Sequence, residues 1–265
     1  MTKSSNQKKK PFLILKYLWE KSDENNFIPM SKIVEYLDSY GINSERKSIY
    51  SDMETLSELG FDIISNRQKG YCLASRDFQL AELKLLCDAV AASKFITPKK
   101  SGELIEKLKK LTSEDQAKSL RRQVAVANRI KTMNESIYYA IDDIHRAIAE
   151  NRKVSFCYFD FDENKQKILR HGGKRYTADP ISLLWDDDNY YLIARDREAD
   201  KIKHYRADKI SGLEILEEKA DAEISKNFDI SEYTSKLFGM FGGEEEAVWL
   251  SCKNSFAGKV IDRFG

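Results

Sequence analysis

The sequence predicts an α+β protein in which a helical N-terminal half precedes a β-rich C-terminal half. Apolar residues recur at helical spacing through residues 11–59 and 78–151. Between residues 153 and 216, short runs alternate between the two faces of a strand and are separated by polar turns, which is typical of antiparallel strands. We therefore divide the chain into four segments, residues 1–76, 77–151, 152–217 and 218–265.

The first segment is predicted to begin with three helices. The first starts at Pro11, because a proline lacks only an N–H that is unpaired in a first turn anyway. The second ends at Gly41, a residue that readily takes the left-handed conformation of a helix C-terminus. The third covers residues 44–59, with Asn43 or Ser44 as its cap.

A β-hairpin follows the third helix, with strands at residues 61–65 and 71–73 around a turn at 66–70. Three helices and a hairpin are the element order of a winged helix-turn-helix, whose third helix enters the major groove of DNA. The predicted DNA contacts are Ser44, Arg46, Lys47, Ser48, Tyr50, Ser51, Arg67 and Lys69. The alternative is a winged helix that binds protein, on which these charges only confer solubility.

The second segment is predicted to contain four amphipathic helices, near residues 80–91, after Pro98, at 120–130 and from 137 to about 151. Their polar faces carry no recognisable catalytic or ligand-binding motif. We expect a helical linker that helps to pair two subunits in a homodimer.

The third segment is predicted to be a small antiparallel sheet. Residues 179–212 read as strands joined by turns, and the alternation places Arg195, His204 and Arg206 near several tyrosines. Guanidinium groups pair with phosphates and aromatic rings stack on bases, so such a face suits an anionic, flat ligand. The predicted effector-site residues are Tyr158, Tyr191, Arg195, His204 and Arg206.

This segment resembles the WYL domain of bacterial transcription regulators, which is named after a Trp-Tyr-Leu triplet. The matching residues are Pro180, Leu183, residues 190–192 and residues 205–210. Tyr190 stands where the family has tryptophan, Ala207 where it has leucine and Lys209 where it has arginine. The resemblance implies a Sm-like, SH3-type β-barrel.

The first segment is similar to the DeoR-like helix-turn-helix that precedes WYL domains, including a Gly-Tyr-x-Leu wing at residues 70–73. The resemblance implies a nucleic-acid fragment or a nucleotide as the effector. Regulators of phage-defence islands are among the members of this family.

The fourth segment is acidic and irregular as far as residue 246, with a short helix expected near residues 230–238. A strand at 247–250 and a helix from 253 onwards should follow. In the family, a ferredoxin-like C-terminal extension begins in this way. The sequence ends at Gly265 with that unit barely started, so we expect a fragment of a truncated or severed domain.

Composition sets the broad class of the protein. Hydrophobic residues at 42% can build folded cores, and the net charge of +1 does not indicate a partner. The polar, basic N-terminus has no apolar run behind it that is long enough for a signal peptide or a membrane span. The four cysteines are far apart without a C-x-x-C pair, which indicates reduced thiols and a cytoplasmic protein.

Enzymatic activity is not expected. The three histidines form no metal-binding pair, and the P-loop, the G-x-S-x-G elbow and the G-x-G-x-x-G fingerprint are absent from the sequence. The aspartate run at residues 186–188 lacks the glycine and the distal glutamate of a calcium loop, so it reads as a solvated turn. Neither a metal nor a cofactor is predicted.

The sequence therefore predicts a DNA-binding transcriptional regulator, with repression as the simpler mode of action. It would act as a homodimer on a palindromic operator and sense its effector through the barrel. The alternative is an adaptor for single-stranded nucleic acid or RNA in which the barrel is the main binding site. A hydrolase is a distant third.

Overall fold

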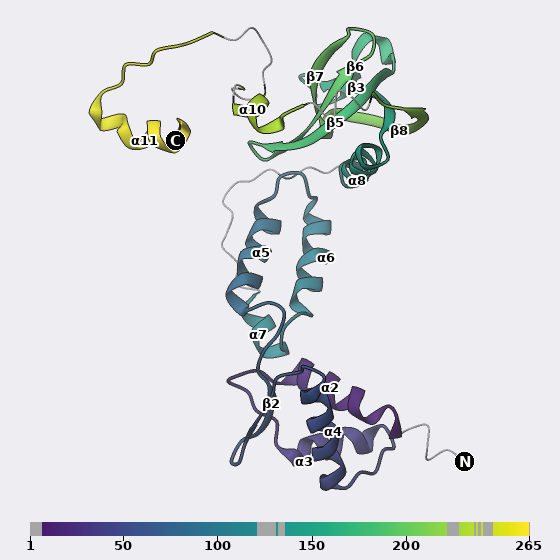
Figure 1. Ribbon diagram of the computed structural model, residues 1–265, viewed down its shortest axis with the longest axis vertical. Coiled ribbons are helices and arrows are strands. Elements are labelled where there is room, and N and C mark those ends of the chain that lie inside the picture. The colour runs from purple at the N-terminus through teal and green to yellow at the C-terminus, as the bar shows by residue number, and fades with distance from the viewer. Residues whose placement is uncertain are drawn as a thin grey trace. The chain divides into compact units, whose positions relative to one another are not determined.

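The computed structural model describes residues 7–120, 131, 136–221, 228–235, 237, 240 and 246–264, which fall into two compact units, Met1–Tyr138 and Tyr139–Gly265 (Figure 1). Helices dominate the first unit and an antiparallel sheet dominates the second, which confirms the mixed helix and sheet prediction. The helix expected at residues 120–130 lies almost wholly outside the described residues.

Residues 7–76, which we call the head, contain three helices and a hairpin in the predicted order. These elements are α2 (Lys10–Lys21), α3 (Met30–Ser39), α4 (Arg46–Glu58), β1 (Ile63–Asn66) and β2 (Gly70–Leu73). Their apolar faces share one core that includes the fully buried Ile14, Leu18, Ile33, Leu37 and Ile49. Burying these stripes together stabilises helices that are too short to persist alone in water.

The hairpin is tied to the segment before α3 at Gly70. Ile28 forms an antiparallel bridge with Tyr71, and Gly70 has a φ of +109°. A Cβ at Gly70 would lie 2.1 Å from the backbone oxygen of Ile28, a distance no side chain tolerates. Only glycine therefore allows this close approach of the two backbones.

The start of α4 corrects one prediction. The N-cap residue is Glu45, in an extended conformation, and its side chain makes no capping hydrogen bond. The helix thus begins after the predicted caps, and neither Asn43 nor Ser44 bonds to its first turn. Ser44 is half-buried, and its hydroxyl has no hydrogen-bond partner among the described residues.

Three further helices follow the head in the same unit, namely α5 (Leu80–Ala92), α6 (Pro98–Lys109) and α7 (Glu114–Ser119). The first two were predicted, whereas α7 was not. Leu83 and Cys87 from α5 pack with Leu120, which follows α7. Ser113 caps α7 by accepting a hydrogen bond from the backbone N–H of Gln116.

The second unit consists mainly of one helix and a curled antiparallel sheet (Figure 1). Its elements are α8 (Ser136–Ala149), β3 (Arg152–Phe161), β4 (Lys167–Leu169), β5 (Tyr176–Asp186), β6 (Asn189–Asp196), β7 (Lys201–Arg206) and β8 (Ile210–Lys219). The strand order is β4-β3-β5-β6-β7, and β8 pairs with β3. Because no ladder joins β7 to β8 in the described part of the chain, the sheet is a half-barrel.

The turns of this sheet follow the local sequence. Asp187 and Asp188 both have positive φ and make a two-residue hairpin loop between β5 and β6, as the predicted turn requires. The β5–β6 register shifts between Pro180 and Ser182, where a proline cannot donate to the ladder. The concave core contains Phe156, Leu192 and nine other buried residues, most of them from the sheet and α8.

The C-terminal part corrects a second prediction. The expected strand at residues 247–250 is absent, and this stretch has no regular structure. Val248 and Trp249 are 75% and 97% exposed, because no described strand pairs with them. Short helices are present at α10 (Ile230–Ser235) and α11 (Ala257–Phe264), near the predicted positions.

Within the described ranges, none of the helices has both the length and the apolar character needed to cross a bilayer. The four cysteines are free thiols. Among those same residues, no three His, Cys, Asp or Glu side chains are grouped so that they could hold a metal ion.

Candidate functional site

The N-terminal half of α4 presents an exposed polar surface. Arg46, Lys47, Tyr50 and Ser51 are all exposed. Neither Arg46 nor Lys47 has an ion-pair or hydrogen-bond partner among the residues that the structure describes. With no side chain capping the helix, the backbone N–H groups of Arg46 and Lys47 also remain available to an anion, whereas that of Ser48 donates to the carbonyl of Glu45.

Ser48 differs from its neighbours because it is engaged by a buried lysine. Lys10 is only 4% exposed and donates a hydrogen bond from Nζ to the Ser48 hydroxyl. The same Nζ lies 2.7 Å from Oδ2 of Asp52, one helical turn further along α4. Lys10 therefore anchors the first two turns of α4 to the first helix of the head.

The tip of the hairpin carries the other predicted contacts. Arg67 and Lys69 are exposed, and the Asn66 side chain shapes the turn by accepting hydrogen bonds from the N–H groups of Gln68 and Lys69. The rings of Tyr50 and Tyr71 lie 6.1 Å apart, so the exposed side of α4 packs on the hairpin. The strand that follows the hairpin tip therefore packs beside the helix that carries Arg46 and Lys47.

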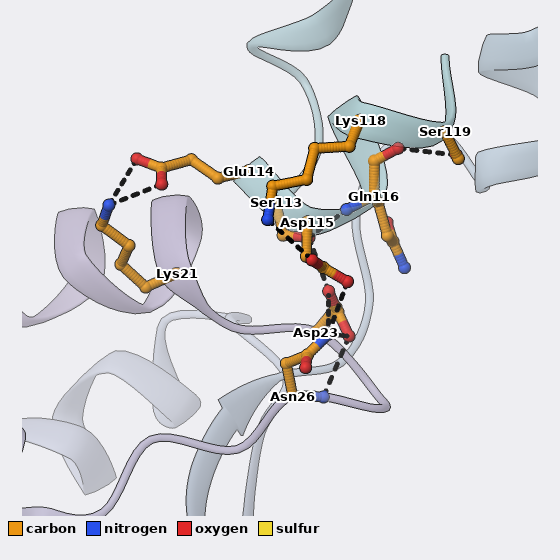
Figure 2. A network of polar contacts seen from close by, with 9 residues as sticks. All are labelled: Lys21, Asp23, Asn26, Ser113, Glu114, Asp115, Gln116, Lys118 and Ser119. Atoms are coloured by element: carbon orange, nitrogen blue, oxygen red, sulfur yellow. Dashed lines mark hydrogen bonds and ion pairs between the residues drawn. The ribbon is translucent and has the colours of Figure 1, made fainter. Parts of the chain in front are cut away.

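A buried carboxylate attaches α7 to the head (Figure 2). Asp23 is 1% exposed, and its Oδ1 accepts hydrogen bonds from the N–H groups of Asn25 and Asn26 at 3.0 Å. Its Oδ2 accepts a hydrogen bond from the hydroxyl of Ser113 at 2.5 Å. One side chain thus orders the loop after α2 and holds the start of α7.

Exposed ion pairs and hydrogen bonds surround this contact (Figure 2). Lys21 pairs with Glu114 at 2.6 Å, and Asn26 donates to Asp115 at 3.4 Å. Trp19 also donates from its indole nitrogen to the carbonyl of Lys110. The helical segment after the head is therefore fixed to it by polar contacts rather than by a shared apolar core.

Replacing Asp23 with alanine is expected to destabilise the head by about 3 kcal/mol, since one buried donor and several part-buried donors lose a charged acceptor at once. Urea unfolding monitored by far-UV circular dichroism checks this value. Glu24→Ala is the matched control, because Glu24 is exposed and its contact with Gln116 should contribute less than about 1 kcal/mol. Equal losses in the two variants would contradict the structural role of Asp23.

In the second unit, the alternation predicted for β6 is confirmed. Leu192 and Ala194 lie in the concave core, whereas Tyr191 and Ile193 belong to a separate apolar cluster. β7 pairs with β6 so that Ile193 stands opposite His204 and Tyr191 opposite Arg206. Four of the five predicted effector-site residues therefore share one region of β6 and β7, as the sequence indicated.

Tyr158, the fifth, lies elsewhere. It is 7% exposed and belongs to the concave core, and its hydroxyl accepts a hydrogen bond from the backbone N–H of Arg206 at 3.0 Å. Burial raises the pKa of this hydroxyl. The guanidinium of Arg170 lies 5.1 Å from its ring centroid. Tyr158 supports β7 from the inside of the sheet, while Arg170 covers the ring.

Both predicted arginines are held by carboxylates. Arg206 pairs with Asp208 through two hydrogen bonds at 2.8 and 2.9 Å, and its Nη2 also donates to the Asn189 side chain. Arg195 lies 2.5 Å from Asp200 and 3.3 Å from Asp221. An anionic ligand would have to exchange with these carboxylates.

His204 is bonded on both ring nitrogens. Nδ1 lies 2.8 Å from the carbonyl oxygen of Met240, and Nε2 lies 2.8 Å from the hydroxyl of Tyr233. Because a carbonyl only accepts hydrogen bonds, Nδ1 carries the proton and donates. In the neutral imidazole, Nε2 therefore accepts a hydrogen bond from Tyr233.

The cluster around Tyr191 and His204 is closed by residues that follow the sheet. We call them the cover, and they are Phe228, Ile230, Tyr233, Leu237 and Met240. They pack on Ile181 and Ile193, which are 8% and 0% exposed. The part of the predicted effector face around Tyr191 and His204 is thus covered by the protein's own residues, while both side chains stay half-buried.

Asp196 anchors the turn between β6 and β7. It is 3% exposed and accepts hydrogen bonds from the hydroxyl of Tyr205 at 2.6 Å, from Nζ of Lys203 at 2.9 Å and from the N–H of Ala199 at 2.8 Å. Although burial alone would raise the pKa of Asp196, these donors hold it at about 2.

Acid is therefore expected to weaken the second unit through Asp196. The folded pKa lies below the value of about 3.9 for a free aspartate, so the stabilisation is fully present above about pH 5 and is lost as the pH falls toward 2. The loss should be about 2 kcal/mol. Asp196→Asn should lower stability at pH 7 and flatten its dependence on pH. Urea unfolding at pH 7, 4 and 2.5 measures both, and parallel pH curves for the two proteins would exclude this role.

Sequence reasoning missed the residues that act from outside the predicted surfaces. Lys10 closes a basic run and has the sequence signature of a solvated tail, yet it is buried. Tyr233 falls in a predicted helix, but helical spacing does not tell which surface a six-residue helix covers. The turn-forming residues after α2 were the only signal for Asp23.

Comparison with known proteins identifies part of the second unit. Residues 139–215 match the model of the WYL domain, which confirms the resemblance for these residues. No curated protein matches the chain. Among solved structures it is similar to proteasome accessory factor B/C (PafBC) of Arthrobacter aurescens, with 16% identity and a TM-score of 0.30 over 83% of this chain. The match covers 35% of that protein, so the chain spans about a third of its length.

Proposed function

We propose that this chain is a DNA-binding transcriptional regulator, in which the head is a winged helix-turn-helix and the WYL domain senses an effector. In this proposal, α4 enters the major groove and the hairpin contacts the flanking backbone. The protein binds rather than catalyses.

The distribution of unpaired cations is the observation that supports this proposal most strongly. Each arginine between residues 139 and 221 forms an ion pair. In the head, Arg46 and Arg67 are exposed and have no such partner among the described residues. Both lie on the predicted DNA-binding surface, where a guanidinium can bind phosphate or the edge of guanine.

The proposal includes dimerisation, repression and control by an effector, as expected for a winged helix-turn-helix regulator. Two subunits would present α4 to half-sites about one helical turn apart on a palindromic operator. A dimer bound there represses by blocking polymerase. An effector can change this state only if it binds one subunit arrangement more tightly than the other. The family resemblance suggests phage-defence genes as targets.

Selection of bound duplexes from fragments of the organism's own genome tests the proposal. We expect enrichment of one palindrome, with half-sites separated by about one helical turn. Retention of single-stranded DNA or RNA without enrichment of any duplex would instead favour the adaptor alternative, in which the WYL domain is the main binding site.

A further inference from the structure

We propose that the cover is an internal competitor of the effector, which binds the β6–β7 face only when Tyr233 and its neighbours leave it. The inference rests on the proposed function, because it takes the sensing face of the WYL domain as the ligand site. It adds the mechanism that keeps this face closed in the absence of ligand.

His204 already has a hydrogen-bond partner at each ring nitrogen. Both ring nitrogens are used by the cover, one by the Tyr233 hydroxyl and one by the Met240 carbonyl, each at 2.8 Å. A ligand that needs His204 must therefore replace at least one of these partners. A site whose polar groups are already satisfied binds ligand only by exchange.

The side chains of the cover indicate which kind of ligand could take their place. The Tyr233 ring stands edge-on to His204, with centroids 5.6 Å apart, and is tilted against Phe228 at 4.6 Å. Tyr191 packs in the same cluster. Tyr233 thus supplies a flat ring with a polar atom at its edge, which is also what a nucleobase offers.

The carboxylate of Asp221 occupies the place that an anionic group of the ligand would take beside Arg195. Arg195 is on β6, the strand that also carries Tyr191. Its Nη1 lies 3.3 Å from Oδ2 of Asp221. Arginine binds carboxylate and phosphate oxygens through the same planar donors. A ring at the position of Tyr233 and an anion at the position of Asp221 together describe a nucleotide or an unstacked residue of a single strand. The stacked bases of a duplex cannot offer the same ring.

The cover can leave without unfolding the domain. The concave core, which contains Phe156, Leu192 and Tyr205, includes no residue of the cover. The cover instead packs on the other side of β6, against Ile181 and Ile193. α10 has six residues, too few to be helical without its packing partners. Opening would therefore cost the contacts of the small cluster and the two hydrogen bonds of His204, and it would leave the concave core intact.

Fluorescence anisotropy with the full chain tests this mechanism, using a short fluorescein-labelled single-stranded DNA of mixed sequence as the probe. Tyr233→Ala is expected to bind the probe about tenfold more tightly than the wild type, as for a cover closed about nine-tenths of the time. Tyr233→Phe, which loses only the hydroxyl, should show a smaller gain. Tyr139→Ala, at an exposed tyrosine outside the cluster, is the matched control and should show no gain.

Two further experiments locate the ligand site and distinguish a free nucleotide from a nucleic-acid strand as the ligand. Adding His204→Ala to Tyr233→Ala should remove the gain if the probe binds at the uncovered face. Unlabelled mononucleotides that compete with the probe would indicate a free nucleotide, whereas competition by oligonucleotides alone would indicate a strand.

The inference is overturned if neither Tyr233 variant binds the probe more tightly than the wild type, or if the gain survives removal of His204. The smaller Tyr233→Phe change keeps the test decisive should Tyr233→Ala misfold. Duplex binding by the head is measured on the same proteins. If the proteins bind the duplex but neither Tyr233 variant binds the probe more tightly, only the role of the cover is rejected. If the wild type does not bind duplex DNA, the proposed function is rejected.

Discussion

Replacing both Arg46 and Lys47 with alanine is expected to lower the affinity of the chain for its selected duplex by about a hundredfold at fixed salt. A direct phosphate or base contact typically contributes about 1–3 kcal/mol, and two are lost. Stability should not change, because both side chains are exposed and neither packs in the head core. The slope of log affinity against log salt should also fall by about 1 for each phosphate contact removed.

A charge-matched control separates a site effect from a net-charge effect. Lys84→Ala with Lys107→Ala removes the same charge from exposed positions on α5 and α6. Fluorescence anisotropy at two salt concentrations should show only a small change for this pair. If the control lost as much affinity as the α4 variant, the contribution would be general electrostatic attraction and α4 would not be the reading helix.

Lys10→Ala is expected to destabilise the head by about 3–5 kcal/mol, the usual cost of breaking a buried ion pair from one side. Its Nζ lies 2.7 Å from Oδ2 of Asp52, a buried oxygen that has no other polar partner in the described part of the chain. Removing the ammonium leaves that charge uncompensated beneath α4. Trp19 fluorescence during urea unfolding, in a background with Trp185 and Trp249 replaced by phenylalanine, reports on the head alone.

Two variants test the cause of this loss. Lys9→Ala removes a neighbouring lysine that is exposed, and it should change stability by less than about 0.5 kcal/mol. Lys10→Met combined with Asp52→Leu replaces the pair with apolar side chains and should recover most of the stability. If the double variant were as unstable as Lys10→Ala, the loss would come from packing around the lysine stem rather than from the buried charge.

Local patterns determined much of this fold. The stripes of α2, α3 and α4 and the hairpin at Gly70 could be read directly, because helix and strand periods and turn chemistry depend on near neighbours in the chain. The alternation in β6 likewise placed Tyr191 and Ile193 on the opposite face from Leu192 and Ala194. The WYL resemblance of the same region was also visible in the sequence.

The apolar stretch at residues 247–250 shows where such reasoning fails. Its composition predicts a strand, but a strand exists only when another strand pairs with it, and Val248 and Trp249 are exposed without one in the described structure. The short α7 was missed for the opposite reason. Its six residues carry too little periodicity to be recognised, and Asp23 and Ser113 hold it in place from 90 positions apart.

The sequence by itself determined the types of most elements, the two faces of β6 and the cationic residues of α4 and the hairpin. Only the tertiary structure decided that Lys10 is buried under α4, that carboxylates hold Arg195 and Arg206, and that Tyr233 and Met240 close the face around His204. The physical reason is that the environment of a side chain depends on which distant elements meet it. Burial and pairing of charges are set by these long-range contacts, about which local periodicity carries no information.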